Sequence, residues 1–187
     1  LYPCFCSRSE VRASSGGLVD PDGAPLYRGT CRNLDPDAAA DRIARGEPAQ
    51  WRLDVEAAMT VAGALMINVT QPVPASPTTQ RRALPERWGD VVLVRKDTPT
   101  SYHLSVVVDD TLQGVSHVTR GMDLEASTDI HRLIQALLGL PSPLYCHHAL
   151  IRDLNEEKLS KSRGSESLQS LRAQGWTAED VRRRLGF

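Results

Sequence analysis

The stretch "DVVLVRKDTPTSYHLSVVVDD", from Asp90 to Asp110, contains two apolar runs that are rich in β-branched residues. The runs "DVVLVRK" and "YHLSVVVDD" are separated by the turn-forming residues "DTPTS". Apolar runs of this length and composition are typical of strands that are buried in a sheet. The segment "GVSHVTRG" (114–121) continues in the same style, so the sequence predicts neighbouring strands across 90–121.

Helices alternate with strands towards the C-terminus. A helix is predicted from Ser127, its N-terminal cap, to Gly139, because apolar residues recur between them at helical spacing. These residues are Ile130, Leu133, Ile134, Leu137 and Leu138. Another strand is expected at 143–151, and two short helices at 165–174 and 177–185. Strands that alternate with helices predict an α/β core.

The N-terminal half is less regular. Asp35 is a predicted N-cap, Pro36 occupies the first helical position, and Gly46 ends that helix. The remaining elements are expected as loops at 7–26 and 71–80 and as strands at 50–55 and 59–69. We therefore expect this half to be an irregular insertion into the α/β core.

The composition is that of an ordinary globular protein. The chain has 187 residues, of which 41% are hydrophobic and 24% are charged, and its formal net charge is −1. No global positive field therefore favours nucleic acid, and any such contact has to use a local patch. No run of eighteen apolar residues exists, so the sequence predicts no membrane span.

The N-terminus suggests both a location and an origin. It has neither the charged flank nor the apolar centre of a secretory signal, and we expect a cytoplasmic protein. The first residue is Leu1, and the first methionine is Met59. We therefore expect the chain to be a processed form or part of a longer protein.

Three cysteines near the N-terminus form a candidate metal site. Cys4 and Cys6 are too close in sequence to form a comfortable disulfide with each other, and Cys31 follows. Zinc takes four ligands in a tetrahedron, and no histidine lies near these cysteines in the sequence. The nearest remaining donor is the phenol of Tyr27, four residues before Cys31. The alternative is that the thiols pack as small apolar groups.

Tyr102 and Arg120 form a candidate anion site. Each lies in or beside a predicted strand, and if the two strands are neighbours, a phenol and a guanidinium converge on one small anion. The alternative is that both are surface or structural residues. Asp109 and Asp110, which are followed by Gly114, favour a hairpin turn over a metal site.

The segment "EKLSKSRG" (157–164) is a candidate site for a polyanion. It places three cations and two hydroxyl groups in eight residues and ends on glycine. Ammonium and hydroxyl donors stabilise phosphate oxygens, so this loop suits a triphosphate. The alternative is a solvated turn without a function.

Six motifs together resemble one family in their order and spacing. They are "YPCFCSR", "LYRGTCRNLDP", "GDVVLVRKD", "YHLSVVVDDTLQGVSHVTRGMDL", "LPSPLY" and "KLSKS". The chain resembles the glutamate-activating class I aminoacyl-tRNA synthetases, and among them most of all the short paralogues, the glutamyl-Q tRNA(Asp) synthetases. The resemblance covers nearly the whole chain and is weakest at 13–25 and 60–86.

The resemblance implies roles for individual residues. "KLSKS" is similar to the KMSKS signature of class I, with Leu159 in place of methionine. Lys161 is thereby implied as the main catalytic cation at the ATP triphosphate, with Lys158 assisting it. The other implied site residues are Ser160 and Asp123 for ATP, Tyr102 and Arg120 for glutamate, and Cys4, Cys6, Tyr27 and Cys31 for a structural zinc ion.

The resemblance also implies a fold. The chain would be the second half of a Rossmann-type catalytic domain with a zinc-bearing insertion, and the HIGH signature of the first half would lie before Leu1. The implied regions are a zinc-binding insertion at 1–35, the rest of the connective and acceptor-binding region at 36–88, the second half of the nucleotide-binding fold with the "KLSKS" loop at 89–164, and C-terminal helices at 165–187.

The implied activity is the activation of L-glutamate to glutamyl-adenylate with ATP and Mg²⁺, by a monomer. Transfer to the queuosine base of tRNA(Asp) would follow. Without the HIGH half, the chain alone is expected to be inactive. Two alternatives remain: a fragment of an ordinary glutamyl-tRNA synthetase that charges tRNA(Glu), and a catalytically inactive, zinc-stabilised module that binds nucleotide or RNA.

Overall fold

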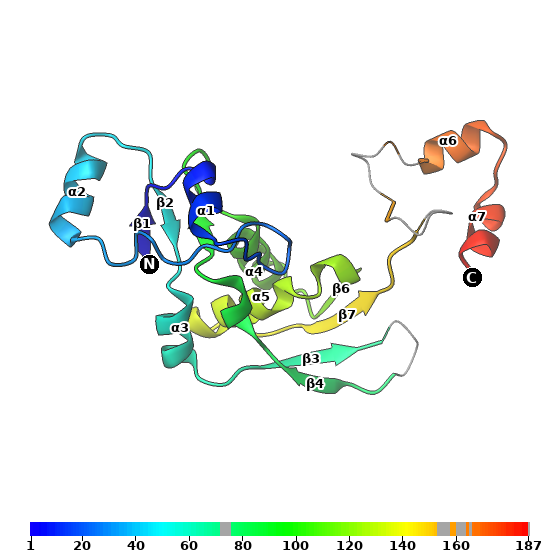
Figure 1. The fold of residues 1–187 in the computed structure, drawn as a ribbon. Coiled ribbons are helices and arrows are strands. Elements are labelled where there is room, and N and C mark those ends of the chain that lie inside the picture. Colours follow the sequence, from blue (N-terminus) through cyan, green and yellow to red (C-terminus); the bar gives the residue numbers. More distant parts are fainter. Residues whose placement is uncertain (72–75, 153–157, 160–163, 165, 187) are drawn as a thin grey trace. The chain divides into compact units, whose positions relative to one another are not determined.

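The computed structural model describes residues 1–71, 76–152, 158–159, 164 and 166–186 (Figure 1). The chain forms two compact units, Leu1–His147 and His148–Phe187. The first unit contains two β-sheets and the helices that pack on them, and the described residues of the second include two short helices.

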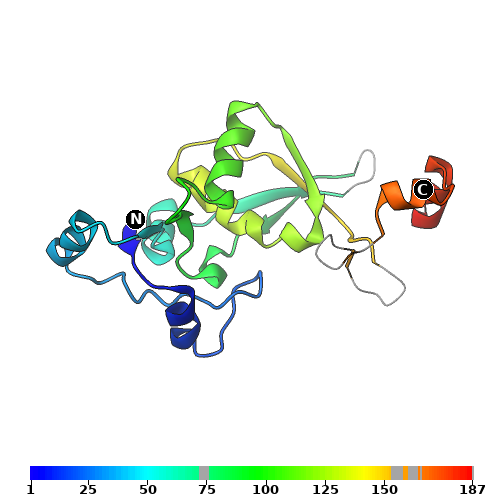
Figure 2. The ribbon, with the colours of Figure 1, turned by 90° about the horizontal axis from the view of Figure 1, so that it is seen from above.

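A small antiparallel sheet joins the N-terminus to two later segments of the first unit. Its strand order is β1-β2-β5, with β1 at Tyr2–Cys4, β2 at Gln50–Arg52 and β5 at Val92–Val94. Helices α1 (Arg8–Ser14) and α2 (Pro36–Ala44) lie between β1 and β2 in the chain and close to this sheet (Figure 2).

Both helices begin where the sequence provides a cap. The Asp35 carboxylate accepts a hydrogen bond from the Ala38 N–H, and Pro36 follows it, so the predicted helix is confirmed. The loop predicted at 7–26 is wrong where α1 forms. Ser7 and Glu10 make a reciprocal capping box there, which satisfies the free N–H groups of the first turn.

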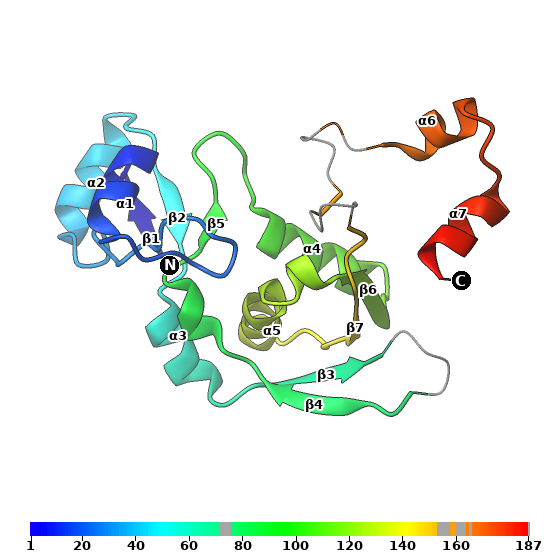
Figure 3. The same cartoon turned by 45° about the vertical axis from the view of Figure 1, so that its right-hand side comes forward.

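The larger sheet combines a parallel pair of strands with an antiparallel pair that forms a long hairpin, which Figure 3 shows. Its order is β4-β3-β7-β6, with β3 at Met66–Thr70, β4 at Thr79–Arg82, β6 at His117–Gly121 and β7 at Leu144–His148. Val69 lies opposite Tyr145 in the parallel pair of β3 and β7, and Met66 lies opposite Arg82 in the antiparallel pair of β3 and β4. The predicted α/β class is confirmed.

Three α-helices and two short 3₁₀ helices complete the first unit. They are α3 (Val55–Ala62), η1 (Pro85–Trp88), α4 (Tyr102–Leu112), η2 (Met122–Leu124) and α5 (Ser127–Leu137). Helix α5 contacts α3, α4, β3 and η1. Its residues Ile130, Leu133 and Ile134 are buried in the hydrophobic core, as the periodic pattern predicts.

The strand predicted at 102–110 is wrong, because this segment forms helix α4. The Ser101 hydroxyl caps the helix by accepting a hydrogen bond from an N–H of the first turn, and Val107 is buried in the core. Capping and tertiary packing therefore override the β-propensity of the valines. Asp109 and Asp110 lie in the last turn of this helix and not in a hairpin.

Two further strand predictions are correct only in part. The segment predicted at 59–69 begins as the end of α3, which stops at Gly63 with φ +70, and only then continues as β3. The segment predicted at 50–55 is a strand only to Arg52. Asp54 ends it because its carboxylate caps α3 at the Ala57 N–H.

The second unit contains α6 (Leu168–Ala173) and α7 (Ala178–Leu185), which confirms the two predicted helices. Gly175 lies between them with φ +89, and Thr177 with Asp180 forms a capping box at the start of α7. None of the helices in the described parts of the chain has the length and hydrophobicity that a membrane crossing requires.

Candidate functional site

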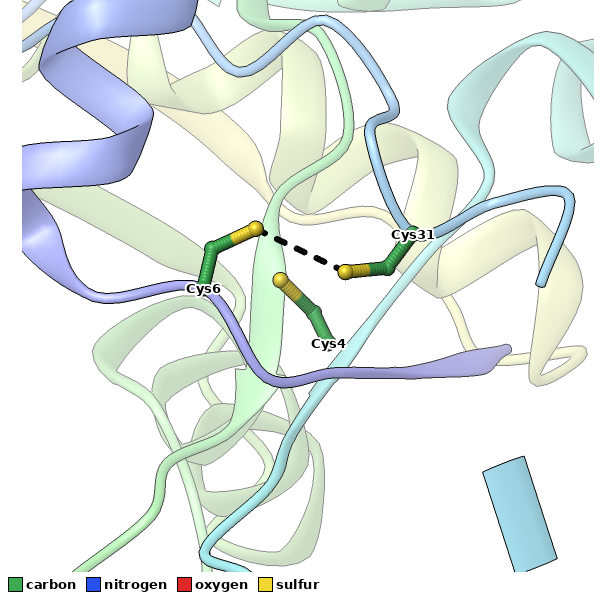
Figure 4. Close-up of side chains that lie close together, drawn as sticks. All are labelled: Cys4, Cys6 and Cys31. Carbon is green, nitrogen blue, oxygen red and sulfur yellow. Dashed lines mark hydrogen bonds between the residues drawn. The ribbon is translucent and has the colours of Figure 1, made fainter. Parts of the chain in front are cut away.

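Three cysteine thiols converge in the N-terminal part of the first unit (Figure 4). Cys4 ends β1, Cys6 precedes α1, and Cys31 lies in a turn before α2. Their Sγ atoms all lie within 4.8 Å of one another, and those of Cys6 and Cys31 are 3.5 Å apart. A tetrahedral zinc site with bonds of about 2.3 Å has sulfur–sulfur edges of about 3.8 Å, so the three thiols fit such a site.

Tyr27 adds an oxygen atom to the cysteine cluster. Its side chain is 4% exposed, and its hydroxyl accepts a hydrogen bond from the Cys4 thiol across 3.4 Å. The hydroxyl also accepts a hydrogen bond of 2.7 Å from the Cys31 N–H, which orients it. Three sulfur atoms and one oxygen supply four donors, the number that zinc takes in a structural site. The structure thus brings together all four ligands that the resemblance implies, and we call this group the cysteine clip.

The ionisation of the clip favours a bound cation. Burial, together with the Cys31 thiol, raises the pKa of Cys6 to about 12, and burial raises the pKa of Tyr27 well above its ordinary value. Burial also raises the pKa of Cys4, but hydrogen bonds from Tyr27 and Arg52 outweigh it and bring that pKa to about 7. Neighbouring thiolates repel one another, so a divalent metal ion is what allows the thiols to ionise together.

A buried carboxylate ties the clip to the rest of the first unit. Arg32, the residue after Cys31, donates hydrogen bonds of 2.9 and 3.0 Å to the two oxygens of Asp90, which is 1% exposed. The same carboxylate accepts a 3.0 Å bond from the Val55 N–H at the start of α3. A two-pronged ion pair of this kind fixes orientation as well as position.

A second cluster forms around Arg120 on β6. Arg120 Nη1 donates to the Tyr102 hydroxyl across 3.5 Å, although Tyr102 begins helix α4 and does not lie in a strand. The guanidinium also lies 5.4 Å from the ring centroid of Tyr145 on β7. The structure therefore brings the two predicted residues together by a different route from the one that the sequence suggested.

The Arg120 guanidinium donates its other hydrogen bonds to neutral acceptors. These are Thr128 Oγ1 at 2.5 Å, His131 Nδ1 at 3.2 Å and His147 Nε2 at 3.3 Å. Among the described residues, no carboxylate lies within the 4.0 Å of an ion pair with Arg120. The partly buried cation therefore has no ion-pair partner in this part of the chain, and this arrangement suits a small anion.

A line of hydrogen bonds fixes the protonation of two histidines beside Arg120. A guanidinium has no acceptor, so His131 accepts at Nδ1, and its Nε2–H then donates to His103 Nδ1 across 3.2 Å. Burial, with the charge of Arg120 adding to it, lowers the pKa of His131 to about 2 and that of His103 to about 4. Both imidazoles are therefore neutral at physiological pH.

The sequence gives only a weak signal for these histidines. His131 lies three residues before Ile134, and hence on the edge of the apolar face of α5. A polar residue at such a position indicates a buried hydrogen-bonding partner, but its identity depends on the fold. His147 contacts Arg120, whereas His148, the next residue of β7, is exposed, because successive side chains of a strand point to opposite faces.

Of the four residues implied for ATP, the structure describes two, and both are exposed. Asp123 is exposed on η2, and Lys158 is exposed and pairs with Arg152 in an isolated antiparallel bridge. Ser160 and Lys161 lie outside the described residues.

Comparison with known proteins shows the family of the chain. Residues 1–186 match the family model for the catalytic domain of the class I tRNA synthetases of the E and Q group. The chain therefore belongs to this family, in agreement with the resemblance of its motifs.

Relatives with known names match this chain over nearly its whole length. A glutamyl-Q tRNA(Asp) synthetase of Rhodobacter capsulatus is 41% identical, and the match covers 100% of this chain and 67% of that protein. One of Symbiobacterium thermophilum is 36% identical over 97% of this chain and 53% of its own length. The chain thus spans about two thirds of the first relative and about half of the second.

Other similarities are more distant. A glutamate–tRNA ligase 2 of Nitrosococcus oceani is 33% identical over 95% of this chain and 36% of its own length. Among solved structures, a glutamate–tRNA synthetase of Elizabethkingia anophelis has a TM-score of 0.58 at 22% identity, covering 87% of this chain and 32% of that one. This last likeness supports the fold alone.

Proposed function

We propose that this chain carries half of a site in which L-glutamate reacts with ATP to form glutamyl-adenylate. The observation that carries the proposal is the Arg120 cluster: a partly buried guanidinium, held by three neutral acceptors, that faces a tyrosine hydroxyl. Such a guanidinium binds a carboxylate through two parallel hydrogen bonds, and the Tyr102 hydroxyl offers one more directed contact. The names of the relatives point to the same amino acid.

We assign the phosphate chemistry to the "KLSKS" segment. Adenylate formation is the attack of a carboxylate oxygen on the α-phosphorus of ATP, with pyrophosphate as the leaving group. Lys161, assisted by Lys158, would stabilise the charge that develops on the phosphates, and Ser160 and Asp123 would complete the ATP pocket. The Mg²⁺ that accompanies ATP would neutralise phosphate charge as part of the substrate.

We assign a structural zinc ion to the cysteine clip. Cys4, Tyr27 and Cys31 are the buried residues of a small cluster that is separate from the main core, and Leu34 packs against it. A cluster of this size has little hydrophobic driving force of its own, so metal binding would contribute much of its folding free energy. The ion would hold residues 1–35 in shape and take no part in the reaction.

For the acceptor we propose the queuosine base of tRNA(Asp). The two glutamyl-Q tRNA(Asp) synthetases are the more similar of the named relatives, and they match the chain over nearly its whole length. A second candidate acceptor is tRNA(Glu), because a glutamate–tRNA ligase is also 33% identical.

The test uses protein that carries the complete catalytic domain. We expect glutamate-dependent ATP–pyrophosphate exchange, and transfer of labelled glutamate to tRNA(Asp) that contains queuosine but not to tRNA(Asp) that lacks it. Transfer to tRNA(Glu) instead would select the second acceptor. Exchange that responds equally to aspartate or glutamine, or no exchange at all, would contradict the assignment of the Arg120 cluster.

A further inference from the structure

A groove beside the cysteine clip concentrates positive charge. It has a volume of about 500 Å³ and lies between α1 and the segment that follows β5. Its charged lining residues are Arg8, Arg12, Arg52, Arg95, Lys96 and Asp97. Five cations therefore face one carboxylate in a chain whose 22 basic and 23 acidic residues nearly balance.

Four of the five cations can offer charge to a ligand, whereas Arg52 is buried and donates to the Asp90 carbonyl. Arg8 and Arg12 are exposed, and neither forms an ion pair with a carboxylate of the described residues. Arg95 pairs with Asp97 across 3.4 Å at the surface, where such a pair is weak. The Lys96 ammonium donates a hydrogen bond of 2.8 Å to an uncharged partner, the Phe5 carbonyl.

The groove continues towards the Arg120 cluster. An adjoining pocket of about 440 Å³ shares Arg8, Arg52 and Arg95 with it and extends to Tyr102 and His103. The far pocket is also lined by the carboxylates of Asp20, Asp22 and Asp90. The three carboxylates balance the three shared arginines in the inner pocket, so phosphate is attracted less there than in the outer groove. The inner volume lies within the range of small-ligand pockets.

We propose that the outer groove binds the phosphodiester backbone of an RNA loop, so that one base of that loop enters the inner pocket towards Tyr102. The proposal rests on the proposed function, because it supplies the path by which the RNA acceptor reaches the activated glutamate. Arg8 and Arg12 would contact phosphates without reading the base sequence. Recognition of the base would be left to the inner pocket.

The experiment measures the dissociation constant of tRNA(Asp) against salt concentration for protein with the complete catalytic domain. The test variant is Arg8→Glu with Arg12→Glu, and its control is Arg45→Glu with Arg82→Glu, which reverses the same charge at exposed residues outside both pockets. We expect binding to weaken about tenfold or more in the test variant. The slope of log K against log salt should fall by about 1.4 in magnitude, which is about 0.7 for each lost phosphate of a single strand. Glutamate-dependent exchange and zinc content should stay unchanged.

Unchanged tRNA binding in the test variant would overturn the proposal, and so would an equal loss of tRNA affinity in the control variant. A parallel loss of exchange in the test variant would also overturn it, because the arginines would then serve folding or activation. A wild-type protein without exchange would instead reject the proposed function. The binding measurement would still decide whether the groove holds RNA.

Discussion

The cysteine clip and the Arg120 cluster differ in the sign of the charge that they offer to a ligand. In the clip, three thiols lie with their sulfur atoms within 4.8 Å of one another beside a phenol, and such a donor set suits a cation. In the Arg120 cluster, a cation is held by a threonine and two histidines that accept its hydrogen bonds, and this arrangement suits an anion. The two proposed ligands therefore carry opposite charges.

The two sites also differ in how the chain builds them. The clip uses four residues that lie between Cys4 and Cys31, and its donors are recognisable by residue type alone. The Arg120 cluster draws on α4, β6, α5 and β7, which come together only when the first unit folds. A site of the first kind depends on a bound ligand for its shape, whereas one of the second kind is shaped by the packed core around it.

The largest effect is expected at the centre of the Arg120 cluster. Arg120→Ala removes the charge that the substrate carboxylate is proposed to meet. We expect kcat/KM for glutamate to fall roughly 30-fold to several thousand-fold, which corresponds to a loss of about 2–5 kcal/mol in transition-state stabilisation. Arg120→Lys should rescue little, because an ammonium group cannot reproduce the two-pronged contact. Glutamate-dependent ATP–pyrophosphate exchange measures both variants.

A matched control for Arg120→Ala is Arg132→Ala. Arg132 lies on α5 and donates to the Met66 carbonyl, away from the cluster. It should leave exchange close to the wild-type value. Comparable losses in the two variants would mean that arginine substitutions harm the fold, and the carboxylate assignment would fail.

The next effect concerns the metal. Cys31→Ser removes one thiolate, and we expect a zinc content near one ion per chain in the wild-type protein to fall towards zero. Residues 1–35 should then become sensitive to protease while the larger sheet stays protected, because the clip has little core of its own. Cys146→Ser, which changes a buried cysteine outside the clip, should leave the zinc content unchanged. A wild-type protein without zinc, prepared in the absence of chelators, would refute the site.

These expectations also show what the sequence could and could not reveal. The convergence of the three thiols and the phenol was predictable because such donors are few in kind and their spacing is local. Helix α5 was predictable because its apolar period is strong. Helix α4 was not, because the propensity of its valines favours a strand, whereas the cap at Ser101 and the burial of Val107 favour a helix.

The composition of the Arg120 cluster was predictable only in part. Motif resemblance singled out Tyr102 and Arg120, whereas His131 gave only the weak signal of its place at the edge of an apolar helix face, and no local pattern pointed to His103. Their neutrality results from burial, and the direction of their hydrogen bonds follows from contact with a donor-only guanidinium. Both properties belong to the folded structure, so no spacing rule can supply them.

A smaller effect is expected when the clip keeps its thiols and loses only its oxygen. Tyr27→Phe preserves the ring that Arg52 covers at 3.7 Å but removes the hydroxyl between Cys4 and the Cys31 N–H. We expect zinc affinity to fall by about 10- to 100-fold, the range for a residue that supports or completes a metal site. Competition with a chromophoric chelator measures it. An unchanged affinity would limit the ligand set to the three cysteines.

The smallest effect tests whether the neutral histidine positions Arg120. His131→Leu removes the acceptor at 3.2 Å from Arg120 Nη1, whereas His131→Gln keeps an acceptor on a side chain of similar length. A hydrogen bond to a charged group contributes about 1.5–3 kcal/mol, so we expect KM for glutamate to rise about tenfold or more in His131→Leu and KM for ATP to stay constant. His131→Gln should recover most of the loss. A purely structural histidine would lower kcat and thermal stability together and would leave the ratio of the two KM values unchanged. Equal behaviour of the leucine and glutamine variants would mean that the packed neighbours alone hold Arg120. The Arg120 cluster would then differ further from the cysteine clip, in which individual polar atoms define the site.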